Sequence, residues 1–154
     1  MLSEDCARNV VEAPKCVALG RAARVKGDAM GKEAIVSAKA PAALGPYSSA
    51  VKADDTLYLS GQLGIDPATG ELAEGVEAQA RQAMRNIAGV LEDSGASFDN
   101  VVKMTVLLAD INDFAVVNEV YGSFLSEPYP ARSAFQVAAI PKGALVEIEA
   151  IAVL

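Results

Sequence analysis

The segment that decides the fold is residues 76–109, VEAQARQAMRNIAGVLEDSGASFDNVVKMTVLLA, where one apolar period gives way to another. Its first part predicts an amphipathic helix ending near Gly95, because apolar residues recur at spacings of three and four: Val76, Ala80, Ala83, Met84, Ile87 and Leu91. Its second part, residues 100–109, is typical of a strand. Helix and strand therefore occur together in one domain.

The segments on either side extend this pattern. Before and after the quoted segment, strands are expected over residues 34–37, 50–53, 56–60, 132–140 and 145–154. A second helix is expected over residues 110–125, and the turn at 141–144 predicts that the last two strands form a β-hairpin. The order β-β-β-α-β-α-β-β predicts an α+β domain with two helices packed on one face of a mostly antiparallel sheet.

The last two expected strands each have one largely apolar face and one mixed face. The mixed face carries Glu147 and Glu149 in the final strand and Arg132 in the strand before it. Both mixed faces are too apolar to be exposed to water. The two helices can cover only one side of the sheet, so the mixed faces on the other side need a different partner. We therefore expect a homo-oligomer whose interface is formed by the mixed faces.

The chain has 154 residues, which suits a single domain, and the periodic segments lie within residues 31–154. Residues 1–30 show no sustained period and are expected to be an N-terminal extension, either disordered or used for targeting. Five basic side chains there favour an organelle presequence, whereas four acidic ones argue against it. No apolar run approaches the roughly 20 residues of a membrane span. The expected location is the cytoplasm, and residues 1–30 leave a mitochondrial or plastid address open.

The residue inventory excludes several kinds of chemistry. The chain has no histidine, and its two cysteines, Cys6 and Cys16, lie in the N-terminal extension. Ser–His–Asp and Cys–His nucleophile systems are therefore excluded, and a zinc site would lack its favoured ligands. We expect no metal and no cofactor. Beyond residue 29, acidic side chains outnumber basic ones by sixteen to eight, and such a surface repels the phosphates of nucleic acids.

Arg132 and Glu147 are the charged residues that stand out by position. Arg132 opens a strand directly after Pro130, where its planar guanidinium could bind a carboxylate through two hydrogen bonds. The structural alternative is an ion pair with Glu147 or Glu149 of a neighbouring subunit. Glu147 lies among apolar residues, where a half-buried carboxylate can have a raised pKa and transfer protons. Its structural alternative is an ion pair with Lys103 or Arg132.

Seven segments of the chain together resemble the YjgF/Rid family. They are Gly45-Pro46-Tyr47-Ser48, Leu59-Ser60-Gly61-Gln62, Val102-Lys103-Met104-Thr105-Val106, Asp113-Phe114, Val117-Asn118-Glu119-Val120-Tyr121, Pro130-Ala131-Arg132-Ser133 and Ile148-Glu149-Ala150-Ile151-Ala152. The segments occur in family order, from about residue 34 to the end of the chain, without large gaps. The resemblance implies a chorismate-mutase-like fold and a homotrimer whose active sites lie between subunits.

The resemblance to the imine-deaminase branch of this family also implies an activity and a set of site residues. The activity is hydrolysis of reactive 2-imino or enamine acids, such as 2-iminopropanoate and 2-iminobutanoate, to 2-oxo acids and ammonia. The resemblance places Arg132 on the substrate carboxylate, Glu147 on the attacking water and Tyr47 in the catalytic loop. It assigns further substrate contacts to Ser60, Gly61, Asn118 and Ala134. Ala134 replaces a cysteine that bacterial members often carry, so its contact is expected through the backbone.

Several of these positions keep a structural alternative. Tyr47 could be a packing lid, and Asn118 could make a capping or interface hydrogen bond. Ser60 is not expected to be a nucleophile, because the sequence offers no base to activate it. Two other functions also stay open: relatives have been described as endoribonucleases that inhibit translation, and the same pocket could serve a non-catalytic regulator that binds a small ligand. The acidic charge and the missing aromatic-plus-basic stripe argue against nucleic-acid binding.

The expected hairpin bears on how the site is shared between subunits. If Ile140 faces Leu145, then Ala138 faces Glu147, and Arg132 lies six residues further along its strand. That separation is about 20 Å within one chain. We therefore expect the neighbouring subunit to supply Glu147 to the site that contains Arg132.

Overall fold

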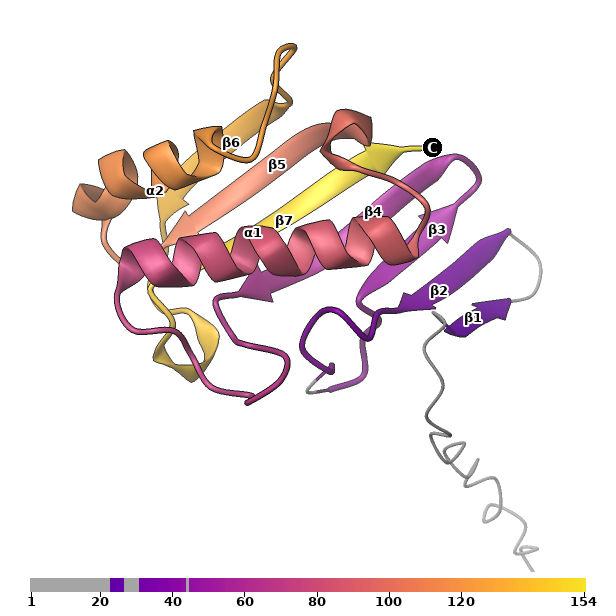
Figure 1. The fold of residues 1–154 in the computed structure, drawn as a ribbon, viewed down its shortest axis with the longest axis horizontal. Helices are drawn as coiled ribbons and strands as arrows, with labels where there is room; N and C mark the ends of the chain where they lie inside the picture. The colour runs from indigo at the N-terminus through magenta and orange to yellow at the C-terminus, as the bar shows by residue number, and fades with distance from the viewer. Residues whose placement is uncertain (1–22, 27–30, 44) are drawn as a thin grey trace, which may run out of the picture.

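Seven strands form one mixed sheet in the computed structural model of the chain, in the order β1-β2-β3-β4-β7-β5-β6 (Figure 1). The structure describes residues 23–26, 31–43 and 45–154. The strands are β1 (Ala23–Lys26), β2 (Lys32–Val36), β3 (Ala50–Ala53), β4 (Thr56–Leu63), β5 (Val101–Leu108), β6 (Ala131–Gln136) and β7 (Val146–Val153). β1 falls within the expected N-terminal extension and pairs with β2. The remainder of that extension, with Cys6 and Cys16, lies outside the described residues.

Two helices, α1 (Val76–Asp93) and α2 (Phe114–Gly122), lie side by side on one face of this sheet (Figure 1). Neighbouring strands are antiparallel except for β5 and β6, which are parallel. The predicted α+β class, with two helices on one face of a mostly antiparallel sheet, is therefore confirmed. None of the helices in the described ranges combines the length and the apolar character that crossing a membrane requires.

The predicted hairpin between the last two strands is wrong. β6 runs parallel to β5 at the edge of the sheet, and β7 lies between β4 and β5. The helix α2 connects β5 to β6, and a crossover through a helix returns the chain parallel to the strand that it left. After β6 the backbone stays beside the end of β5, because Val137 N donates to Leu108 O and Ala109 N donates to Leu145 O. The chain then enters β7 on the other side of β5.

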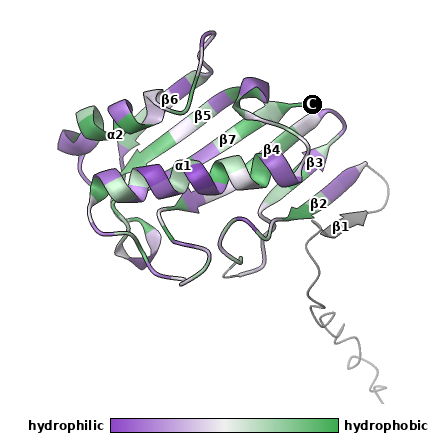
Figure 2. Cartoon of the chain, in the orientation of Figure 1, coloured by the Kyte–Doolittle hydropathy of each residue, from purple (hydrophilic) through white to green (hydrophobic). Residues whose placement is uncertain are grey.

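The helix α1 follows the predicted amphipathic pattern closely. Its buried side is apolar except for Gln79 and Asn86, and its outer side is largely polar, so hydrophobic and hydrophilic residues alternate along it (Figure 2). The fully buried members include Ala80, Ala83, Met84, Ile87 and Leu91. The second predicted helix is shorter than expected. A 3-10 turn, Ile111–Asp113, precedes α2, and the Asp110 side chain accepts a hydrogen bond from Asn112 N at that turn.

A row of paired residues runs across the sheet under the helices and ends at Arg132. From β2 to β5 the row is Ile35, Ala50, Leu59, Ala150 and Met104, all of them buried. Arg132 on β6 is paired with Met104. Because directly paired residues point to the same face, Arg132 lies on the face that carries the helices. The prediction that Arg132 shares a face with Glu147 is therefore wrong.

No helix of the described ranges covers the opposite face of the sheet (Figure 1), and this face carries large apolar side chains. Tyr58, Phe135 and Val153 are each about half exposed there, at 50%, 47% and 45%. Glu147 belongs to this face, since it pairs with Leu63 on one side and Leu107 on the other. We call this surface the open face.

Candidate active site

The site residues fall into two groups, of which the first surrounds Arg132 at the edge of the sheet. Arg132 Nη1 donates a hydrogen bond of 2.7 Å to Asn118 Oδ1 on α2. Its guanidinium carbon lies 5.3 Å from the ring centroid of Phe114 and 4.8 Å from that of Tyr121. These three helix residues are spaced by four and three, so they form one stripe along α2. Asn118 therefore orients Arg132, and the capping alternative for Asn118 is not needed.

None of the described residues neutralises the charge of Arg132. Among the described residues, no carboxylate lies within ion-pair distance of it, although the side chain is exposed. A cavity of about 370 Å³ lies beside it, lined by Asn118, Tyr121, Gly122, Tyr129, Pro130 and Arg132. Guanidinium groups bind carboxylates in a planar, two-point geometry. An arginine that is held in place and still charged beside an open cavity is suited to an anionic ligand.

The second group surrounds Glu147 on the open face. The pairing of β4 with β7 passes from Leu59–Ala150 to Gln62–Ile148, so two residues, Ser60 and Gly61, oppose one. This β-bulge brings the Gly61 backbone against the Glu147 carboxylate. A Cβ at position 61 would overlap that carboxylate, lying only 2.8 Å from its Cδ. A side chain at position 61 would therefore displace the Glu147 carboxylate from its place against the Gly61 backbone.

Glu147 titrates above the usual range of a carboxyl group. Burial raises the pKa of Glu147, and the neighbouring charge of Glu149 raises it further. No ion pair of Glu147 with a basic residue was found in the described ranges. Lys103, the expected alternative partner, instead donates from Nζ to Ser133 Oγ at 2.8 Å. A carboxylate with a raised pKa and no neutralising partner is suited to accept and return a proton.

Ser60 and Tyr47 complete the second group. Ser60 Oγ donates to the Ser48 carbonyl at 2.7 Å and Ser60 N donates to the Ser49 carbonyl at 3.0 Å. The serine therefore ties down the end of the loop that carries Tyr47, and its hydroxyl is already engaged. Tyr47 is half exposed and lines a small recess together with Gly61. The β-bulge and the loop tied to it thus bring four of the predicted site residues together: Tyr47, Ser60, Gly61 and Glu147.

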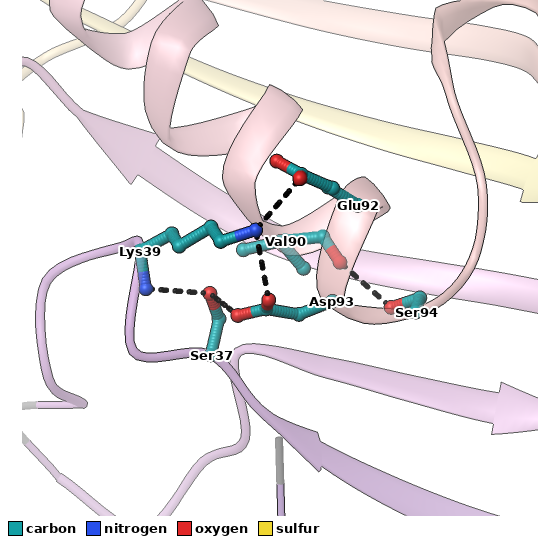
Figure 3. A network of polar contacts seen from close by, with 6 residues as sticks. All are labelled: Ser37, Lys39, Val90, Glu92, Asp93 and Ser94. Carbon is teal, nitrogen blue, oxygen red and sulfur yellow. Dashed lines mark hydrogen bonds and ion pairs between the residues drawn. The ribbon is translucent and has the colours of Figure 1, made fainter. Parts of the chain in front are cut away.

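The other end of the Tyr47 loop is fastened to α1 by a polar network that sequence reasoning missed (Figure 3). Ser37 Oγ donates to Asp93 Oδ2 at 2.8 Å, and Lys39 Nζ lies 2.9 Å from Glu92 Oε1 and 3.4 Å from Asp93 Oδ1. The hydrogen bond that Lys39 donates to the Glu92 carboxylate is the main cause that raises the pKa of Lys39. The backbone of Lys39 packs directly on Gly89, and an isolated glycine inside the predicted helix was the available signal for such a close approach.

The two groups lie on opposite faces of the sheet. Arg132 and Ala134 are paired with the buried residues Met104 and Val106, so they point toward the helices. Glu147 pairs with Leu107 on the open face, two strands and three residues away from Arg132, or about 14 Å along the sheet. The predicted separation of 20 Å rested on the hairpin and is replaced by this one. A small substrate cannot contact both side chains within one chain.

Residues 37–154 match the family model described as Endoribonuclease L-PSP. A 2-iminobutanoate/2-iminopropanoate deaminase of Bos taurus is 59% identical over 123 residues, which cover 79% of this chain and 90% of the relative. The chloroplastic Reactive Intermediate Deaminase A of Arabidopsis thaliana is 49% identical over 131 residues, covering 84% of this chain and 70% of the relative.

The solved structures agree with this result. The crystal structure of RidA from the Antarctic bacterium Psychrobacter sp. PAMC 21119 superposes with a TM-score of 0.75 at 58% identity, covering 77% of this chain and 96% of that structure. The resemblance to the YjgF/Rid family seen in the sequence motifs is therefore confirmed. With a family model over most of its length and relatives of this identity, the chain belongs to the YjgF/RidA family of Endoribonuclease L-PSP proteins.

Proposed function

We propose that the protein hydrolyses 2-imino acids, such as 2-iminobutanoate and 2-iminopropanoate, to 2-oxo acids and ammonia. The observation that carries the proposal is Arg132, a guanidinium held by Asn118 and two aromatic rings but paired with no carboxylate among the described residues. A 2-imino acid offers the carboxylate that such a group would bind. Relatives that are 59% and 54% identical carry the name of this activity.

The chemistry proposed for the site needs only water and proton transfer. The imine nitrogen is protonated, which makes C2 electrophilic. Glu147 accepts a proton from a water molecule as the water oxygen bonds to C2, giving a carbinolamine. Glu147 then returns the proton to nitrogen and accepts the hydroxyl proton as the C=O bond forms and the C–N bond breaks, so that ammonia and the 2-oxo acid leave and the last proton passes from Glu147 to water or ammonia. Arg132 holds the carboxylate in place throughout, so that C2 stays within reach of the water.

The remaining residues have supporting parts in this proposal. The Gly61 backbone and the Ala134 backbone line the substrate, and Tyr47 closes the recess beside Gly61. Asn118 acts through Arg132, and Ser60 acts by tying down the Tyr47 loop. Burial raises the pKa of Glu147, and a raised pKa makes the carboxylate a stronger base for the proton that it takes up and gives back.

We propose further that the protein is a homotrimer and that each site takes Arg132 from one subunit and Glu147 from its neighbour. Two observations support the shared site: the two side chains lie on opposite faces of the sheet, and the open face carries exposed apolar residues such as Tyr58 and Phe135. Large apolar patches of this kind are typical of subunit interfaces. Stacking the open face of one subunit near the Arg132 edge of the next would bring the two groups together.

The test is the release of ammonia from 2-iminobutanoate generated in the cuvette by an amino-acid oxidase. Free imines also hydrolyse spontaneously, so the measured quantity is the acceleration over the rate without protein, followed as loss of semicarbazide-trappable imine. The expected result is an acceleration proportional to protein concentration. Cleavage of a single-stranded RNA is measured in parallel because of the family description. RNA cleavage without imine hydrolysis would contradict the proposal and indicate a ribonuclease. Binding of 2-oxobutanoate without any hydrolysis of the imine would indicate a regulator that binds a small ligand.

A further inference from the structure

We infer that Phe114 and Tyr121 form an aromatic clamp that sets the orientation of the Arg132 guanidinium before any ligand binds. The inference rests on the proposed function, in which Arg132 binds the substrate carboxylate. Phe114 and Tyr121 are seven residues apart on α2, which is two helical turns or about 10 Å along the axis. The guanidinium carbon lies 5.3 Å and 4.8 Å from their ring centroids, so it sits between the two rings.

The stripe on α2 leaves part of the guanidinium free for a ligand. Asn118 lies between the two aromatic residues and accepts a hydrogen bond from Nη1. A guanidinium has five N–H donors, and those on Nε and Nη2 have no acceptor among the described residues. The Nε–Nη2 edge is one that a carboxylate can bind at two points. The clamp therefore fixes the plane of the group and leaves a donor edge available.

The clamp consists of uncharged aromatic rings, so it orients Arg132 without neutralising its charge. A carboxylate partner would also orient Arg132, but it would compete with the substrate carboxylate for the same donors. Aromatic faces attract a cation through the ring quadrupole and accept none of its in-plane hydrogen bonds. A rigid group that is already in the binding orientation loses less entropy when the ligand arrives. Phe114 and Tyr121 are positioning residues in this account, since they act through Arg132.

Tyr121 contacts Arg132 through its ring and not through its hydroxyl. Tyr121 is only 6% exposed, and its hydroxyl has no hydrogen-bond partner within the part of the chain that the structure describes. Burial is the main cause that raises the pKa of Tyr121, and the nearby Arg132 charge opposes that rise. Phe114, by contrast, is 37% exposed at the start of α2, so its ring can be removed with little loss of core packing.

The direct test measures the mobility of the Arg132 side chain in the ligand-free full-length protein by ¹⁵N relaxation of Arg132 Nε–H. The resonance is assigned with Arg132→Lys, and exposed Arg85 on α1 serves as the mobile reference. We expect Arg132 Nε–H to be nearly as ordered as the backbone, with an order parameter near about 0.8, and Arg85 to fall below about 0.6. Phe114→Leu should lower the value for Arg132 alone. An Arg132 as mobile as Arg85 in the unaltered protein would overturn the inference, whatever the enzyme activity.

The functional arm uses matched variants on α2. Phe114→Leu should raise the KM for 2-iminobutanoate and the Kd for 2-oxobutanoate by about two- to fivefold, the range of an exposed cation–π contact. The melting temperature and the assembly mass should stay unchanged. Phe114→Tyr should restore both constants, and Val116→Ala, at an equally exposed position of α2, should alter neither. Equal effects of Phe114→Leu and Val116→Ala, or no rescue by Phe114→Tyr, would contradict the clamp. Absence of imine hydrolysis by the unaltered protein with an ordered Arg132 would contradict only the proposed function.

Discussion

At the scale of single residues, neutral side chains orient the guanidinium of Arg132 without removing its charge. Burial and the nearby Glu149, in contrast, disfavour the charged form of Glu147. The first arrangement keeps a cation available for a carboxylate, and the second raises the pKa of a carboxyl group, which makes its ionised form a stronger base. Each residue therefore has an electrostatic setting that fits the part proposed for it.

Replacing Arg132 tests the anchor. Arg132→Ala removes a bidentate contact worth about 3–5 kcal/mol of transition-state binding, so kcat/KM for 2-iminobutanoate should fall by roughly 10²- to 10³-fold. Arg132→Lys should recover only part of this loss, because an ammonium keeps the charge but lacks the planar fork. Melting temperature and assembly mass, measured on the same samples, should change little. An Arg132→Ala protein with unaltered turnover would remove Arg132 from the site.

Replacing Glu149 tests whether its charge contributes to the raised pKa of Glu147. Burial raises the pKa of Glu147 first and the charge of Glu149 second, so Glu149→Gln should lower that pKa without restoring its ordinary value. Activity needs the ionised form of Glu147, and the acid limb of the kcat/KM profile should therefore move to lower pH. Glu71→Gln, at an exposed position, is the control and should leave the limb in place. A limb that moves to higher pH in Glu149→Gln would contradict the assignment.

The raised pKa of Glu147 also determines how the stability of the fold changes with pH. A carboxyl group whose pKa is raised on folding favours the protonated folded state. Its contribution to stability is fully present below the unfolded pKa and is lost as the pH rises through the folded pKa. Unfolding by denaturant at several pH values should accordingly show a smaller fall in stability between acid and neutral pH in Glu147→Gln than in the unaltered protein.

At the scale of elements, the loop that carries Tyr47 is held at both ends by contacts made through glycine and serine. Ser60 on the β4 bulge fastens one end, and the network of Ser37, Lys39 and Asp93 fastens the other to α1. The exposed ion pair of Lys39 with Glu92 adds little, since such pairs are screened by solvent. The backbone contact on Gly89 is the part that a substitution can disturb.

Gly89→Ala tests that contact. A Cβ at position 89 would lie 2.7 Å from Lys39 Cβ and 2.9 Å from Lys39 O, so the loop must move away from α1. Alanine favours a helix over glycine by about 1 kcal/mol, yet we expect no gain in melting temperature because the displaced loop offsets it. The sequence has no tryptophan, so the fluorescence of a single tryptophan introduced by Ala43→Trp, at an exposed position of the loop, reports a displacement of the loop. Glu92→Ala, the matched control, should alter neither signal. A more stable Gly89→Ala protein with unchanged emission would contradict this contact.

At the scale of the whole molecule, the sheet separates the two halves of the site and the proposed trimer reunites them. In the described ranges the helices cover one face only, which leaves the open face available to the neighbouring subunit of the proposed trimer. The exposed apolar residues there and the position of Glu147 on the same face link assembly to activity. A protein that fails to assemble would lose the site even with every side chain intact.

Mixing two inactive variants tests the shared site. Arg132→Ala and Glu147→Ala proteins are combined in equal amounts, dissociated in denaturant and reassembled. In a cyclic trimer with sites between subunits, three quarters of the trimers are mixed and each mixed trimer has one intact site, so about one quarter of the wild-type activity should return. Each variant carried through the same cycle alone should stay inactive. Subunit exchange shown by mass spectrometry without recovered activity would place both residues in one subunit.

The local patterns of the sequence determined a great deal. The apolar period of residues 76–91 determined α1, and the alternation in residues 146–153 determined which side chains of β7 share a face, because both depend only on near neighbours. The ordered motifs were enough to indicate the family and to single out Arg132 and Glu147. The isolated Gly89 was visible as well, but the sequence does not show which segment packs on it.

The tertiary structure alone decided where those elements meet. Alternation shows that a strand has two faces but does not show which face the helices cover, and so Arg132 was assigned to the wrong one. Strand order depends on long-range pairing: once α2 carries the chain across to β6, β7 pairs with β5 and β4, and the expected hairpin cannot form. The close approach of Glu147 to Gly61 and the setting of Arg132 between two rings arise from that pairing, because each joins residues far apart in the chain.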